Sequence, residues 1–134
     1  MAVQVSESVR KFFEKPNFAV LATRSPAGRL HATPVWFLYE NDQILINTSK
    51  GRAKLRDMQA HPEVALAIVD RENPYQYVQV QGIVVAADAR NGARDIDRLS
   101  QRYVGRPYAY PAGDKPENRV SVRIAPQRVN TMGL

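Results

Sequence analysis

The stretch "FAVLATRSPAGRLHATPVWFLYENDQILINT", residues 18–48, alternates apolar runs with turn-forming residues. The turn-forming clusters are Ser-Pro-Ala-Gly at 25–28 and Glu-Asn-Asp-Gln at 40–43. Short connections of this kind join neighbouring antiparallel strands, so the stretch predicts a meander. Pro34 lies inside the second apolar run and cannot donate a ladder hydrogen bond, which predicts a sheet edge or a bulge. The three strands are expected over residues 18–24, 29–39 and 44–48.

The rest of the chain adds three strands and three helices. Gly82 interrupts a long strand and predicts a bulge, while Asn91 and Gly105 suit the two ends of a helix. Six strands joined mostly by hairpins predict a mainly β fold, a small antiparallel barrel with flanking helices, formed by one domain over residues 1–134. The further elements are strands at 63–70, 75–87 and 119–124, and helices at 5–15, 53–60 and 91–104.

The composition excludes several classes of protein. The chain has no cysteine, so disulfides, thiolate zinc sites and cysteine nucleophiles are excluded. No apolar stretch approaches the roughly 18 residues of a membrane span. Glu7 and Glu14 interrupt the N-terminal segment, which therefore does not resemble a signal peptide. We expect a cytoplasmic protein without a membrane span.

No group of side chains has the spacing of a catalytic or metal centre. His31 lies in a predicted strand and His61 precedes a proline, so both are expected to be plain surface residues. The motifs of serine hydrolases, zinc proteases and P-loops are absent. We therefore expect no metal and no catalytic side chain, and a bound cofactor would supply any reactivity.

A second stretch, "TSKGRAKLR" at residues 48–56, follows an apolar strand and opens a short helix. Cations are unfavourable at a helix N-terminus unless an anion neutralises them. The free N–H groups there attract anions, and Gly51 allows close approach of a ligand. The stretch therefore predicts a phosphate site, with a solvated basic face as the alternative. Its basic residues are Lys50, Arg52, Lys54 and Arg56, of which Arg56 is expected to lie on the surface.

The segment Pro34-Val35-Trp36 is the other candidate binding element. A proline at a bulge exposes backbone groups that the ladder does not use, and a flat heteroaromatic ring could lie against them. Trp36 is the single tryptophan of the chain. The alternative is that Trp36 belongs to the core.

Four motifs follow one another along residues 18–70: G-R-x-x-x-T-P-V-W-F, an apolar strand ending in Thr, G-R-x-K-x-R, and H-P-x-V. This order resembles the split β-barrel flavin and deazaflavin oxidoreductases, the superfamily of pyridoxine 5′-phosphate oxidase. The chain is most similar to the branch that uses the deazaflavin coenzyme F420. The resemblance implies a six-stranded antiparallel split β-barrel with Greek-key topology, the FMN-binding split barrel.

The resemblance also implies a homodimer with cofactor sites at its interface. The cofactor phosphate would be held by Thr48, Arg52 and Lys54, with Lys50 assisting and Asn47 and Ser49 as neighbours. The ring would lie against Thr33, Pro34, Val35 and Trp36, and Tyr77 and Gln79 would lie near the subunit interface.

Two departures from the family pattern limit the comparison. Asp57-Met58 replaces the usual Asn-Leu and would place a carboxylate near the expected anion site. The chain ends at Leu134, without the C-terminal extension by which pyridoxine phosphate oxidases hold their substrate, so that specific activity is disfavoured.

Three functions remain open at this point. The first is an F420-dependent oxidoreductase that transfers hydride between the reduced cofactor and an unsaturated small-molecule acceptor. The net charge of +6 suits its phosphodiester and poly-glutamate tail. The second is an FMN-dependent oxidoreductase similar to pyridoxamine phosphate oxidase. The third is a non-catalytic flavin or F420 binding protein, or a nucleic-acid module, although no nucleic-acid signature is present and we expect no such partner. The loop at 106–116 is expected to shape the acceptor pocket.

Overall fold

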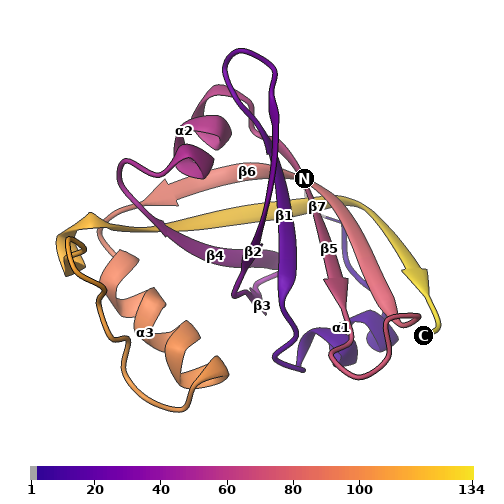
Figure 1. Ribbon diagram of the computed structural model, residues 1–134. Coiled ribbons are helices and arrows are strands. Elements are labelled where there is room, and N and C mark those ends of the chain that lie inside the picture. The colour runs from indigo at the N-terminus through magenta and orange to yellow at the C-terminus, as the bar shows by residue number, and fades with distance from the viewer. Residues whose placement is uncertain (1–2) are drawn as a thin grey trace.

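Seven strands form one antiparallel sheet in the order β2-β1-β5-β6-β7-β4-β3 in the computed structural model, which describes residues 3–134 (Figure 1). Within that range no helix has the length and apolar character needed to cross a bilayer. The strands are β1 (Ala19–Arg24), β2 (Leu30–Val35), β3 (Leu38–Glu40), β4 (Gln43–Ser49), β5 (Glu63–Val69), β6 (Tyr77–Asp88) and β7 (Arg119–Met132). The helices are α1 (Glu7–Phe13), α2 (Ala53–Ala60), α3 (Gly92–Tyr103) and the short 3₁₀ helix η1 (Pro116–Asn118).

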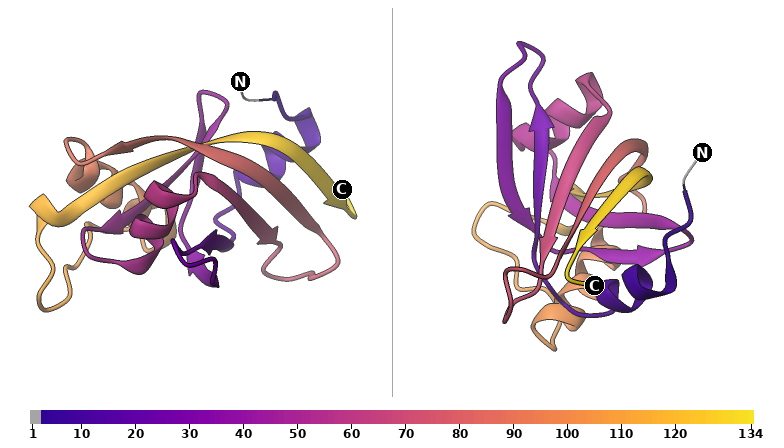
Figure 2. Two further views of the ribbon diagram at one scale, coloured as in Figure 1. Left: turned by 90° about the horizontal axis from the view of Figure 1, so that it is seen from above. Right: turned by 90° about the vertical axis from the view of Figure 1, so that its right-hand side faces the viewer.

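The strand predicted over residues 29–39 is divided in the structure, which gives seven strands instead of six. Its first part, β2, pairs with β1, and its second part, β3, pairs with β4 at the opposite end of the sheet. Only Trp36 and Phe37 separate the two parts, and the Phe37 N–H donates to the Tyr103 hydroxyl (3.2 Å). The sheet must therefore curl until its two ends approach each other at these residues (Figure 2). This curled sheet with flanking helices confirms the predicted split-barrel fold, and Pro34 lies in the edge strand β2 as predicted.

The two longest strands, β6 and β7, pair along the middle of the sheet. The register shifts at Gly82, which confirms the predicted bulge, and a Cβ on Gly82 would lie 2.6 Å from Ile124 Cγ2. Strand β7 continues well beyond its predicted end at residue 124. Its Pro126 lies opposite Gly82, at the irregularity where a missing N–H is tolerated.

Helix α3 ends as predicted but begins differently. Gly105 has a φ of 81° and its N–H donates to the Ser100 and Gln101 carbonyls, which confirms the predicted C-terminal glycine. Asn91 occupies the N-cap position, but its side chain donates to Asp88 (2.7 Å) instead of capping the helix. Asn91 therefore has the predicted position at the start of the helix, but its side chain does not make the predicted capping hydrogen bond.

Candidate functional site

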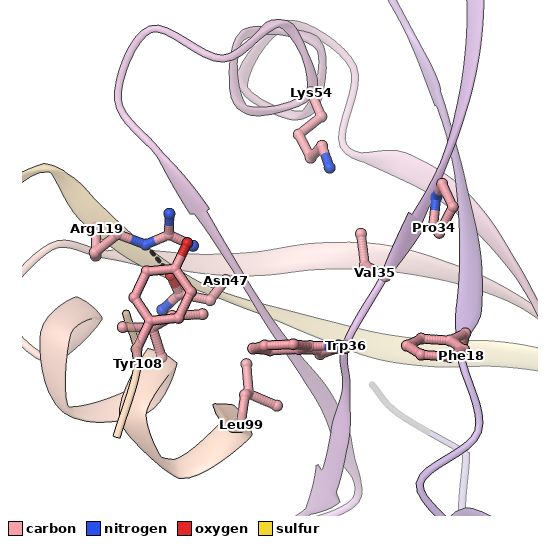
Figure 3. A pocket seen from close by; sticks show the side chains of 10 residues that line it. Phe18, Pro34, Val35, Trp36, Asn47, Lys54, Leu99, Tyr108 and Arg119 are labelled. Atoms are coloured by element: carbon pink, nitrogen blue, oxygen red, sulfur yellow. Dashed lines mark hydrogen bonds between the residues drawn. The ribbon is translucent and has the colours of Figure 1, made fainter. Parts of the chain in front are cut away.

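A cavity of about 270 Å³ opens between β2, β4, α2, α3 and the loop that follows α3 (Figure 3). The curl of the sheet brings β2 and β4 to the same opening, although β1, β5, β6 and β7 lie between them in the sheet order. Most of the wall is apolar or aromatic, with a few polar groups facing inward. The lining residues are Phe18, Pro34, Val35, Trp36, Asn47, Lys54, Ile96, Leu99, Tyr108 and Arg119.

Trp36 forms a fixed aromatic wall of this cavity. Its indole stacks on Tyr103 with a centroid distance of 5.4 Å and an interplanar angle of 11°, and the ring of Tyr108 meets it edge-on. The same Tyr103 also stacks with Phe18 at 5.5 Å, and its hydroxyl donates to the Asn17 carbonyl (2.6 Å). Because Tyr103 is held at both its ring and its hydroxyl, Trp36 rests on a rigid support. Such a surface suits a planar aromatic ligand.

Lys54 extends from the first turn of α2 into the same cavity (Figure 3). Burial lowers the pKa of Lys54, and the nearby charges of Arg52 and Arg119 lower it further. No carboxylate of residues 3–134 forms an ion pair with its ammonium group. A bound anion would therefore stabilise the charged form of Lys54, and a hydrogen bond to it would be charge-assisted.

Arg119 is buried at the start of β7 and joins the two sides of the site. Its Nε donates to Asn47 Oδ1 (2.9 Å), and its Nη1 donates to Ser49 Oγ (2.7 Å) and Asp114 Oδ2 (2.9 Å). Burial raises the pKa of the Asp114 carboxyl, but the hydrogen bond from Arg119 and further contacts outweigh this and leave the pKa below its usual value. Asp114 is therefore a carboxylate at neutral pH.

A second hollow, of about 290 Å³, adjoins the cavity. The two share Tyr108 and Arg119 in their walls. Gly51, which links β4 to α2, has a φ of 88°, a left-handed conformation that glycine adopts at little cost. This turn directs the basic segment toward the second hollow, which is lined by Ser49, Lys50, Arg52, Tyr108, Pro111, Ala112, Gly113, Asp114, Asn118 and Arg119.

The structure thus brings most of the predicted site residues to two adjoining spaces. Pro34, Val35, Trp36, Asn47 and Lys54 line the cavity, and Ser49, Lys50 and Arg52 line the second hollow. Four of the predicted residues line neither space in this chain, and their role as ligands stays a prediction: Thr33, Thr48, Tyr77 and Gln79. Among these, Thr48 is buried and alternates along β4 with Asn47 and Ser49.

Several residues of the cavity wall are not predicted individually by the sequence. The loop at 106–116 does help to shape the cavity, because it contributes Tyr108. Arg119 carries no local signal, because its position depends on the pairing of β7 with β4, which sets Ser49 opposite Arg119. The sequence does not single out Phe18, Ile96, Leu99 or Arg119, and it predicts Tyr108 only as part of the loop at 106–116.

His31 and Asp57 differ from their predicted roles. The Asp57 carboxylate is buried and accepts hydrogen bonds from Thr23 Oγ1 (2.7 Å) and His31 Nδ1 (2.6 Å). It therefore binds α2 to the hairpin of β1 and β2 instead of facing the basic segment. His31 lies on the surface as expected, but it is not a plain surface residue, because its ring is anchored to this carboxylate. Within residues 3–134, no cluster of His, Cys, Asp and Glu could hold a metal ion.

Replacing Asp57 with Asn should lower the free energy of unfolding by about 1.5–3 kcal/mol at pH 7, the range for hydrogen bonds to a charged group. Burial raises the pKa of Asp57, but its bonds to His31 and Thr23 leave it below the ordinary value of 3.8. The contribution should therefore be complete above that pH and disappear as the pH falls through the folded-state pKa. Urea denaturation at several pH values measures it. The exposed Glu117→Gln is the control, and an equal loss in both variants would contradict the role of Asp57.

Comparison with known proteins agrees with this architecture. A solved structure named F420 reductase is 28% identical, with a TM-score of 0.83, and the match covers 94% of this chain and 98% of that chain. A conserved hypothetical protein from Mycobacterium tuberculosis is 21% identical over 98% of this chain and 86% of its own, with a TM-score of 0.74. The heme storage protein from Vibrio cholerae is 15% identical over 98% and 97%, with a TM-score of 0.70. No curated protein matches the chain. The family model described as pyridoxamine 5′-phosphate oxidase matches residues 5–133, and the chain therefore belongs to that family.

Proposed function

We propose that this protein is an oxidoreductase that binds coenzyme F420 and serves hydride transfer between the reduced deazaflavin and an unsaturated small-molecule acceptor. The observation that carries the proposal is the position of Lys54, a cation without a carboxylate partner among residues 3–134, which extends into a cavity with an aromatic wall. The 28% identity to an F420 reductase, over nearly the full length of both chains, supports the same cofactor.

The donor set of the two spaces fits a phosphorylated cofactor with a planar ring. The flat side of the ring would lie against the segment from Pro34 to Trp36, whose indole is held by Tyr103. The phosphate would lie toward Lys54 and Arg52, where hydroxyl and ammonium groups gather. When bound, the reduced deazaflavin supplies the hydride.

The residues of this chain would contribute binding and orientation. Trp36 and its support Tyr103 fix one face of the cavity, so that a ring and an acceptor placed there lose little further freedom on reaction. The apolar side chains of Leu99 and Val35 exclude water from that face. No side chain of the cavity is required as a base, since solvent can supply the proton that the acceptor takes up.

The second candidate function uses FMN in the same position. The family description, pyridoxamine 5′-phosphate oxidase, and the same phosphate donors favour it. The chromophore of the purified protein and an activity assay distinguish the FMN-dependent from the F420-dependent function. A yellow preparation whose released chromophore is FMN would support this second candidate, and reduction of an acceptor only when reduced F420 is added supports the first. A protein that binds either cofactor and reduces no acceptor would be a carrier.

Replacing Lys54 with Ala should weaken F420 binding by about 1.5–3 kcal/mol, or roughly 10- to 150-fold, because a charge-assisted hydrogen bond is lost. Isothermal titration measures the dissociation constant. The matched control is Arg56→Ala on the same helix, since Arg56 is exposed and outside both spaces, and it should change the constant less than about threefold. Unchanged binding in the Lys54 variant would show that the basic segment is a solvated surface and does not bind the cofactor.

We further propose that two copies of the chain associate through the outer face of β1, β5 and β6. This face has an apolar groove of about 550 Å³, and Leu30, which lines it, is 81% exposed. Tyr77 and Gln79 pair with Val69 and Ala67 on this part of the sheet, so they could reach a partner's cofactor. Sedimentation velocity should show a dimer at micromolar concentration. Leu30→Arg should shift it to monomer, whereas Val104→Arg at the end of α3 should not, and a monomeric native chain would contradict the proposal.

A further inference from the structure

The second hollow contains one carboxylate among its cations. Asp114 Oδ2 accepts from Arg119 Nη1 (2.9 Å), and Asp114 Oδ1 accepts from Ser49 Oγ (3.3 Å) and from the Lys115 N–H (2.9 Å). Its side chain is only 10% exposed. The carboxylate therefore occupies hydrogen-bond donors, those of Ser49 and Arg119, that an anionic ligand of this hollow would need.

The other charged groups of the hollow have no such internal partner. Lys50 and Arg52 line it, and no carboxylate of residues 3–134 forms an ion pair with either of them. Arg119 alone among these cations is neutralised, by a residue of the loop between α3 and η1. Arg119 is thus already paired with a carboxylate, whereas Lys50 and Arg52 are available to bind an anion.

The backbone of the loop around Asp114 has few contacts, so the carboxylate is held mainly by its bonds to Arg119 and Ser49. The neighbouring residues 111–113 and Lys115 are exposed, and the turn is closed by one backbone bond from Asp114 N to Pro111 O (3.0 Å). Gly113 has a φ of 86°, and a Cβ added to it would meet no atom within 4 Å, so the space beside it is open. Few buried contacts oppose a small displacement of this segment.

We propose that Asp114 is an internal competitor for the anion site: its carboxylate holds Arg119 and Ser49 until a ligand phosphate replaces it, and its charge lowers the affinity of the site for anions. This inference rests on the proposed function only in identifying that ligand as the phosphate of F420 or FMN. The competition itself requires no redox chemistry. Through its contact with Arg119, Asp114 would determine how tightly the site binds anions and how strongly this binding depends on salt.

The test compares Asp114→Asn with the native chain. Asparagine keeps the shape and a hydrogen-bond acceptor for Arg119 but removes the charge. Titrations use F420, FMN and inorganic pyrophosphate, the last as an anion that involves no catalysis. Removing a negative charge next to an anion should tighten the binding of each probe that binds the native chain by about tenfold and make it more sensitive to salt. Glu117→Gln, an exposed change in the following helix η1, should alter binding less than about twofold.

The outcomes separate this inference from the proposed function. If neither cofactor binds but pyrophosphate binds more tightly to Asp114→Asn, the competition stands and the proposed cofactor is wrong. Equal or weaker pyrophosphate binding in that variant would overturn the inference, because Asp114 would then position Arg119 for the ligand. Failure of pyrophosphate to bind either protein would overturn it as well. Thermal melting of the variant confirms that it remains folded.

Discussion

Replacing Arg119 with Ala should lower the free energy of unfolding by about 3–5 kcal/mol, the range for removing one partner of a buried ion pair. The side chains of Arg119 and Asp114 are 9% and 10% exposed, so the remaining carboxylate would keep little contact with water. The substitution also leaves Asn47 Oδ1 and Ser49 Oγ without their donor. Arg119 joins β7 to β4 and to the loop after α3, so its removal breaks contacts among all three.

A double-mutant cycle identifies the source of this loss. Arg119→Ala combined with Asp114→Ala removes both charges, so the double variant should be more stable than the sum of the single changes predicts by about 1–3 kcal/mol. Urea denaturation of the four proteins gives the coupling energy. Additive losses would show that the contribution of Arg119 does not depend on its ion pair with Asp114, and would contradict this explanation.

Replacing Gly92 with Ala should cost about 3 kcal/mol and should displace α3 from the cavity. A Cβ at this position would lie 1.9 Å from the Arg119 carbonyl oxygen and 2.8 Å from the Val120 nitrogen, both of which are backbone atoms that cannot rotate away. The Gly92 carbonyl also accepts a hydrogen bond from Asn47 Nδ2 (2.9 Å). The clash therefore separates α3 from the strands that hold Arg119 and Asn47.

Gly28→Ala is the matched control for this change. Gly28 has a φ of 89° and open space around a Cβ, so alanine there should cost only the conformational strain of about 1–2 kcal/mol. The fluorescence of Trp36 should shift in the Gly92 variant, since α3 supplies Leu99 to the wall of the same cavity, and remain unchanged in the Gly28 variant. Native stability and fluorescence in Gly92→Ala would mean that the contact of α3 with β7 is loose.

Local patterns are sufficient to predict the hairpins of this fold but not its closure. The composition of residues 40–43 predicts a turn, and Asn41 and Asp42 indeed have φ values of 55° and 61°, which a two-residue hairpin of type I′ requires. The break at Trp36 and Phe37 cannot be predicted in this way, because both residues favour strands. Where they leave the ladder, the Phe37 N–H donates to the hydroxyl of Tyr103, which lies far along the chain.

The same distinction holds for the site. The basic segment can be recognised because Lys50, Arg52 and Lys54 are close in sequence and precede a helix. Its counterpart Arg119 comes from a strand much later in the chain, and only the register of β4 against β7 brings it to Ser49. The expectation that Asp57 lies near the anion site is wrong, because the sequence does not show which face of α2 packs against β1.

The most direct test of the proposed cofactor is a titration of the native protein with F420 and with FMN, at about 50 and 500 mM salt, followed by the fluorescence of Trp36. Trp36 is the single tryptophan and lines the cavity, so a ring bound there should quench its emission. The proposal predicts quenching at micromolar F420, weaker binding of FMN, and a loss of F420 affinity at the higher salt concentration. Absence of quenching by F420 at either salt concentration would contradict it.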